Sequence, residues 1–160
     1  MTTLRLASIE HRELVSARTG EPFAFSAVVS ELLGVRSLFI HHDVIPPGRR
    51  ASGRHFHTER DEVVIVLEGT VQYDRGGARG VAHAGDAIGF PAGEASAHAI
   101  ENHSSEPATI LVVSNAAKAD GTIHVEHEQH EAMTPVIRPV KKKARRKATK
   151  KSRAREMTER

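Results

Sequence analysis

Residues typical of turns divide residues 21–115 into short apolar runs. This regular spacing constrains the fold more than any other feature of the sequence. Residues 36–45 and 62–67 are rich in branched and aromatic side chains, and these runs stop near Pro46 and Gly69. Val, Ile and Phe favour strands, whereas Gly and Pro favour turns. No helical period competes over residues 21–115. Short strands with turns roughly every 8–12 residues are typical of an all-β sandwich or barrel, which is the fold that we expect.

The composition agrees with one small soluble domain. A chain of 160 residues falls within the usual size of a single domain, and with only five Phe, one Tyr and no Trp its core must use Val, Ile, Leu and Ala. The absence of cysteine excludes disulfides, thiolate nucleophiles and cysteine-ligated metal sites. The first residues lack a basic region followed by a long apolar core, and no apolar run near them approaches the roughly 20 residues that span a bilayer. We therefore expect a cytoplasmic protein with no membrane contact.

Charge is distributed unevenly along the chain. Residues 136–160 hold 12 Lys/Arg and 2 Asp/Glu, a net charge of +10, whereas the first 135 residues carry −7. Such an asymmetry indicates segments with different partners. The expected division is an N-terminal arm, a barrel, an acidic histidine-rich extension and a basic tail, at residues 1–20, 21–115, 116–135 and 136–160.

The basic tail has almost no apolar residues to bury, so we expect it to be disordered when free. Residues 139–155 carry most of its charge, and such a run attracts polyanions through the release of counterions. Weak, sequence-independent binding to nucleic acid is therefore one hypothesis. A solubilising tail without a dedicated partner, or one that folds back on the acidic part of the chain, explains the same composition.

A candidate metal site begins with His55 and His57. Side chains two residues apart on a strand point to the same face, so both imidazoles can project into a barrel interior. After a gap that suits a tight turn, Glu62 adds a carboxylate. A fourth ligand must come from elsewhere, and His98 is a candidate because it follows the turn at Pro91. The plainer alternative is a pair of histidines on a polar strand face, without metal.

These segments resemble the two sequence motifs of the cupin superfamily. The first motif is matched by Gly48, His55, His57, Glu62 and Gly69. The second is matched by Gly85, Pro91, Gly93, His98 and Asn102. The spacing in the second motif is similar to that of small bacterial single-domain cupins. The resemblance covers about residues 40–115, and two motifs in the right order are far more specific than one pair of histidines.

The resemblance implies a double-stranded β-helix, or jelly-roll, barrel that pairs as a homodimer. It implies that four residues hold one divalent ion of iron, manganese, zinc, nickel or copper: His55, His57, Glu62 and His98. Three imidazoles and a carboxylate suit these metals, and an octahedral geometry leaves two positions for water or substrate. The glycines and Pro91 are expected to shape turns, and Asn102 to hydrogen-bond a loop.

Two functions from different classes fit this site. The first is a metal-dependent enzyme of the dioxygenase or isomerase type that acts on a small organic molecule. The second is a non-catalytic module that binds a metal or small ligand while the tail docks on nucleic acid. No dedicated general base stands out, so catalytic residues are unknown, although His41 or His42 could line the cavity mouth. The histidines at positions 124, 127 and 130 lie in the acidic extension and are not expected to form the main site.

Overall fold

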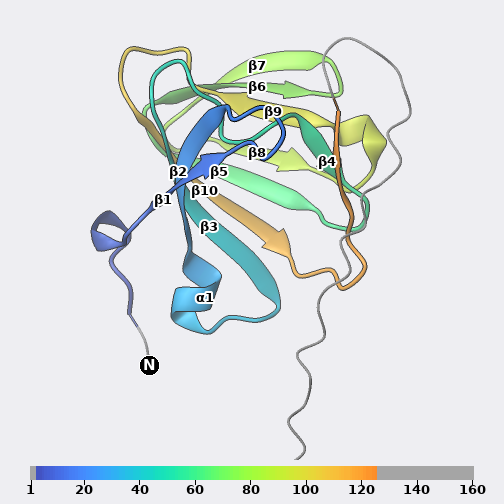
Figure 1. Cartoon of the computed structure of the whole chain (residues 1–160), viewed down its shortest axis with the longest axis horizontal. Coiled ribbons are helices and arrows are strands. Elements are labelled where there is room, and N and C mark those ends of the chain that lie inside the picture. Colours follow the sequence, from blue (N-terminus) through green and yellow to red (C-terminus); the bar gives the residue numbers. More distant parts are fainter. Residues whose placement is uncertain (1–2, 126–160) are drawn as a thin grey trace, which may run out of the picture.

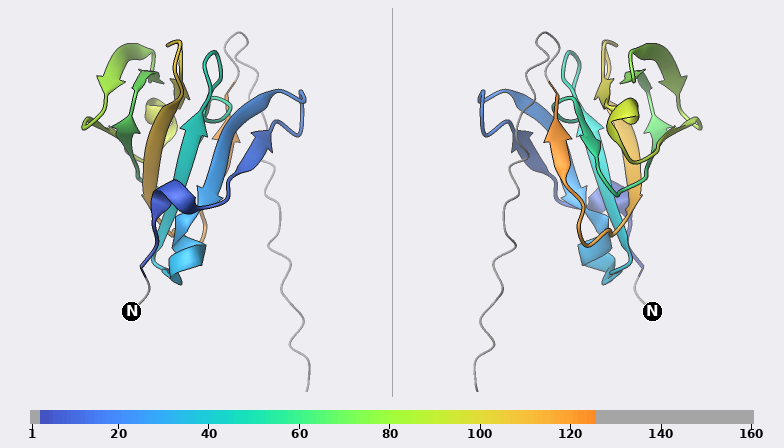
Figure 2. Two further views of the ribbon diagram at one scale, coloured as in Figure 1. Left: turned by 90° about the vertical axis from the view of Figure 1, so that its left-hand side faces the viewer. Right: turned by 90° about the vertical axis from the view of Figure 1, so that its right-hand side faces the viewer.

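Two antiparallel β-sheets face each other in the computed structural model, which describes residues 3–125. The six-stranded sheet has the order β1 (Arg12–Val15), β2 (Pro22–Val28), β3 (Leu38–Ile45), β10 (Ala108–Asn115), β5 (Glu62–Glu68) and β8 (Ala87–Phe90). The five-stranded sheet has the order β11 (Thr122–His124), β4 (His55–His57), β9 (His98–Glu101), β6 (Thr70–Arg75) and β7 (Ala78–His83). The β1–β2 and β6–β7 hairpins lie at opposite sides of the barrel (Figure 1, Figure 2). The prediction of an all-β barrel is confirmed.

The core lies between the sheets and consists mainly of branched aliphatic side chains. Along β5, Val64 and Val66 are about 1% exposed, whereas Val63 between them is 40% exposed. This alternation follows from the two-residue period of a strand. Because Glu62 is in register with Val64 and Val66, its carboxylate also faces the interior. The same pattern that builds the core therefore positions a functional group at one end of it.

Within residues 3–125 the helical elements are short and lie before or between strands. They are α1 (Val29–Leu33) and two single 3₁₀ turns, η1 (Leu6–Ser8) and η2 (Glu94–Ser96). We expected no helix in residues 21–115, and α1 corrects that expectation. It has five residues, too few to show a helical period, and it ends at Gly34, whose φ of 70° gives a left-handed cap. No helix among residues 3–125 has the length and hydropathy needed to cross a membrane.

Both ends of the described chain pair with the barrel. In the segment expected as an arm, β1 pairs with β2 at the edge of the six-stranded sheet. In the segment expected as an extension, β11 pairs with β4 and places His124 opposite His55. Residues 126–160, including His127, His130 and the basic tail, lie outside the described residues, so the predicted disorder of the tail is untested.

One motif glycine occupies a position that no other residue would fit without strain. Gly69 joins β5 to β6 with a φ of 77°, in the left-handed region. A Cβ atom at this residue would lie 2.9 Å from the carbonyl oxygen of Pro107. The tight turn therefore packs directly against the start of β10.

Candidate metal centre

The pairing of β4 with β9 brings two predicted ligands side by side. His55 and His57 are both buried and lie at the two ends of the three-residue strand β4. His55 is the direct partner of His98 on β9, and their ring centroids are 4.6 Å apart. The ring of His57 lies 5.0 Å from that of His55. One sheet thus supplies all three imidazoles.

The carboxylate comes from the opposite sheet. Glu62 Oε1 lies 3.2 Å from His98 Nε2, and Glu62 Oε2 lies 3.6 Å from His57 Nε2. Ligand atoms of His55, Glu62 and His98 all lie within 4.8 Å of one another, a grouping that does not include His57. We refer to the four side chains as the histidine–glutamate cluster: His55, His57, Glu62 and His98.

Each imidazole of the cluster is fixed through its Nδ1 atom by a hydrogen-bond acceptor. Nδ1 of His55 lies 2.8 Å from the carbonyl oxygen of Gly53, and Nδ1 of His98 lies 2.9 Å from that of Ser96. Nδ1 of His57 lies 2.8 Å from Oδ2 of Asp120. Because carbonyl and carboxylate oxygens accept, each Nδ1 donates its hydrogen and the Nε2 atom keeps a lone pair. This arrangement is common around imidazoles that bind metals.

The electrostatics of the cluster favour a cation. Burial and the neighbouring His98 lower the pKa of His55 to about 4, so His55 is neutral at pH 7. Burial raises the pKa of Glu62, but when His57 and His98 carry a second proton on Nε2 their hydrogen bonds outweigh burial and hold that pKa below its ordinary value. With Nδ1 of His98 donating to Ser96, the lone pair on its Nε2 faces a carboxylate oxygen. A proton or a metal ion between these atoms removes the repulsion, and the donor set fits a divalent ion.

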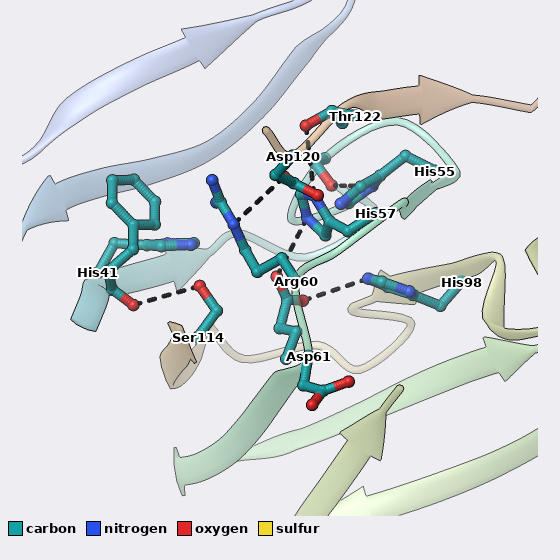
Figure 3. A network of polar contacts seen from close by, with 12 residues as sticks. His41, His55, His57, Arg60, Asp61, His98, Ser114, Asp120 and Thr122 are labelled. Atoms are coloured by element: carbon teal, nitrogen blue, oxygen red, sulfur yellow. Dashed lines mark hydrogen bonds and ion pairs between the residues drawn. The ribbon is translucent and has the colours of Figure 1, made fainter. Parts of the chain in front are cut away.

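Asp120 connects the cluster to the loop that precedes β11. Its carboxylate is 3% exposed, accepts from the backbone N–H of Glu59 at 3.1 Å, and forms an ion pair with Arg60 Nε at 3.3 Å. Figure 3 shows Asp120 between His57 and Arg60, with a dashed line to each. The guanidinium of Arg60 in turn lies over the ring of Phe39 at 5.1 Å. Sequence reasoning missed Asp120, since an aspartate before a glycine reads as an ordinary loop residue.

A cavity of about 160 Å³ opens beside the cluster. The cluster forms one wall, and the aliphatic side chains of Val64, Ile100, Ile110 and Val112 form much of the rest. No Lys or Arg is among the residues of the described chain that line it. Such a mixture of an apolar surface and a few converging polar groups is typical of sites for small molecules.

Two polar residues of β3 also line the cavity. His41 Nδ1 lies 2.9 Å from Oδ1 and 3.0 Å from Oδ2 of Asp43, and Asp43 is 1% exposed. Burial alone lowers the pKa of His41, but the hydrogen bond and the charge of Asp43 outweigh it and raise that pKa. His42 points the other way, toward His11, which lies 2.8 Å from it. Of the two histidines expected at the cavity mouth, His41 lines the cavity and His42 does not, whereas Asp43 was not expected there.

Asn102 lies away from the cluster and holds a loop. Its Nδ2 atom donates to the carbonyl oxygens of Ile45 and Glu106, each at 2.8 Å, and its Oδ1 atom accepts from Ser104. Asn102 is fully buried, so these bonds satisfy a polar side chain that solvent does not reach. The motif glycines at positions 48, 85 and 93 all have positive φ angles, at turns near strand ends.

Comparisons with known proteins agree with this fold. The family model of the cupin domain matches residues 41–114. A crystal structure described as a sugar phosphate isomerase of the cupin superfamily, from Silicibacter pomeroyi, is 28% identical, with a TM-score of 0.68 over 78% of this chain and 82% of that one. A crystal structure from Acidithiobacillus ferrooxidans is 25% identical, with a TM-score of 0.68 over 78% and 79%.

A more distant structure shares the fold alone. The polyketide cyclase RemF from Streptomyces resistomycificus is 17% identical, with a TM-score of 0.64 over 81% of this chain and 88% of that one. Among curated proteins, the comparison found no match. The fold is therefore shared with proteins whose described chemistries differ, so the function must be argued from the site.

Proposed function

Because the chain belongs to the cupin superfamily, we propose that its histidine–glutamate cluster holds one divalent metal ion through which a small organic molecule is bound and transformed. Three imidazoles aimed at one carboxylate, each with its Nδ1 atom hydrogen-bonded to an acceptor, carry this proposal. The Nε2 atoms of His57 and His98 both face Glu62, an orientation that suits a cation between them. The donor set suits iron, manganese, zinc, nickel or copper.

The cluster would bind the ion, and the aliphatic lining of the cavity would exclude water. A bound ion would polarise a carbonyl group or activate dioxygen. The chain's own part is to fix the ligand atoms, through the partners of the Nδ1 atoms, and to keep one side of the cavity dry with Val64, Ile110 and Val112. These side chains favour a compound whose carbon skeleton is small and whose oxygen atoms reach the ion.

An enzyme of the isomerase or dioxygenase type is the reaction class that we propose. The isomerase is supported by the description of the 28% identical structure from Silicibacter pomeroyi. A dioxygenase would use the same ligands and is distinguished by consumption of oxygen. The homodimer, the cytoplasmic location and the binding of nucleic acid by residues 139–155 remain predictions, and the tail lies outside the described residues.

Elemental analysis of the purified, untagged protein tests the proposal. We expect about one ion per chain in the wild type and almost none in the double variant His55→Ala/His57→Ala. The matched control is His103→Ala, because the His103 side chain is 52% exposed and pairs with Glu101, outside the cluster. The histidines near residue 124 stay intact in every variant. Equal metal content in the double variant and the control, or none in the wild type after reconstitution, would refute the proposal.

A further inference from the structure

A histidine–aspartate pair shares the cavity with the histidine–glutamate cluster, and the metal site gives it no role. His41 and Asp43 lie two residues apart on β3, so both side chains point into the barrel. Their backbone partners on β10 are Val112 and Ile110, which line the same cavity. The pair therefore faces the same space as the cluster and reaches it from a different strand.

The pair has the geometry of an oriented base. Both carboxylate oxygens of Asp43 lie within 3.0 Å of His41 Nδ1, so this nitrogen donates its hydrogen to Asp43. The lone pair then resides on Nε2, for which no hydrogen bond is found within residues 3–125. A buried carboxylate that fixes the tautomer and stabilises the imidazolium is what a proton-transferring histidine needs. A histidine needed only for packing would not require a buried charge as its partner.

We propose that His41, held in position by Asp43, transfers a proton between two adjacent carbon atoms of a small, uncharged α-hydroxycarbonyl compound in the cavity. This inference rests on the proposed function, because the metal ion held by the cluster would bind the oxygen atoms of that compound. His41 would be the residue that touches the reacting carbon, and Asp43 a positioning residue.

The reaction balances without an added oxidant or reductant. His41 Nε2 removes the proton from the carbon that bears the hydroxyl group, and the electron pair of that C–H bond forms a carbon–carbon double bond as the carbonyl π pair moves to oxygen. The hydroxyl proton passes to the former carbonyl oxygen. The imidazolium then returns its proton to the neighbouring carbon. An aldose and a ketose are exchanged in this way.

The lining of the cavity argues for an uncharged substrate. With no Lys or Arg among the described lining residues, a phosphate group inside the cavity would have no cationic side chain to neutralise it. The volume of about 160 Å³ also favours a compound with few carbon atoms. We therefore expect this protein to prefer an uncharged compound, whereas the Silicibacter pomeroyi protein is described as an isomerase of a sugar phosphate.

Exchange of carbon-bound hydrogen with deuterium tests the inference. The probe is dihydroxyacetone in D₂O with the zinc-reconstituted full chain, and loss of its proton signals is followed by NMR. General acid–base catalysis contributes about 10²–10⁴-fold, so His41→Gln should slow the exchange by at least about 100-fold. The glutamine amide can still donate to Asp43, which limits the damage to the fold. His42→Gln is the matched control, because His42 faces the opposite side of the same strand, and its exchange rate should not change.

Two further readouts separate a chemical role from a structural one. Bound zinc and the line broadening of dihydroxyacetone on binding should be unchanged in His41→Gln. In Asp43→Asn, the pH at which exchange falls on the acidic side should shift downward, because the raised pKa of His41 depends on Asp43. Glu62 and Arg60, the other charged groups that act on His41, stay the same in that variant.

Each outcome decides the inference. Exchange that persists in His41→Gln, zinc lost from that variant, or an acidic limb unmoved in Asp43→Asn would overturn it, as would faster exchange of dihydroxyacetone phosphate than of dihydroxyacetone. A wild type that holds zinc and the probe but catalyses no exchange would also overturn it while leaving the proposed metal site intact. A wild type that binds no metal would instead refute the proposed function.

Discussion

Replacement of Asp120 tests whether the network around the cluster serves the metal ion. Asp120 accepts from His57 Nδ1 at 2.8 Å and pairs with Arg60 Nε at 3.3 Å, although it does not touch the cavity. An outer partner of this kind typically contributes 10–100-fold to metal affinity, about 1.4–2.7 kcal/mol. We expect Asp120→Asn to weaken zinc binding about 10-fold, because an amide oxygen can still accept from Nδ1. Asp120→Ala should weaken it about 100-fold, because nothing then orients the ring.

Stability of the metal-free protein separates orientation from folding. Asp120→Ala also removes the partner of Arg60, and one broken buried ion pair costs about 3–5 kcal/mol. The Arg60 side chain is 21% exposed, so we expect a loss at or below the lower end of that range. Asp120→Asn keeps the shape of the side chain and should lose less. Urea unfolding of the apo protein gives these values, and competition with a chelator gives the zinc affinity.

Asp61→Asn is the control for this experiment. Asp61 directly precedes Glu62 in the sequence, but its carboxylate accepts from the backbone N–H of Ala92 and, within the described part of the chain, from no imidazole. An asparagine can keep that bond, so zinc affinity should stay within about twofold of wild type. If Asp120→Asn and Asp120→Ala both bind zinc as tightly as Asp61→Asn does, the orienting role of Asp120 is wrong.

Three further predictions follow from single features of the barrel. The contribution of His55 to zinc affinity should hold from pH 7 down to about pH 5 and be lost near pH 4, because burial and His98 lower the pKa of His55 to about 4; titration of bound zinc against pH in the wild type and in His55→Ala checks this. Ile110→Ala should lower the free energy of unfolding by about 2–5 kcal/mol, since Ile110 is 0% exposed, and urea denaturation measures the change. Gly69→Ala should cost at least about 1 kcal/mol in the same assay, because it adds a Cβ next to the Pro107 carbonyl at a positive φ, and an unchanged midpoint would contradict the strain.

The candidate metal site was predictable from sequence because its information is largely local. His55 and His57 are two residues apart, and Glu62 begins the strand that follows one turn later. Only His98 required a long-range inference, and the turn before β9 marked it. The structure brings these side chains to one end of the barrel, whereas the identity of the ion is a question for elemental analysis.

The partners of the site were not predictable, because they depend on pairings between distant strands. Asp43 becomes notable only when β3 aligns with β10 and places His41 beside the cavity. Asp120 reaches His57 only because β11 pairs with β4, a contact between residues 63 positions apart. The short helix α1 is a local element, but it was missed because five residues are too few to show a helical period.

The pairing of β11 with β4 also determines where the chain can be truncated without loss of the site. A fragment that ends at residue 115, where the apolar pattern stops, would lack Asp120 and would uncover the backbone edge of β4 that carries His55 and His57. Exposed strand edges recruit other strands and promote aggregation. The shorter fragment should therefore aggregate and lose its metal even though every predicted ligand is present, and the smallest useful unit extends through His124.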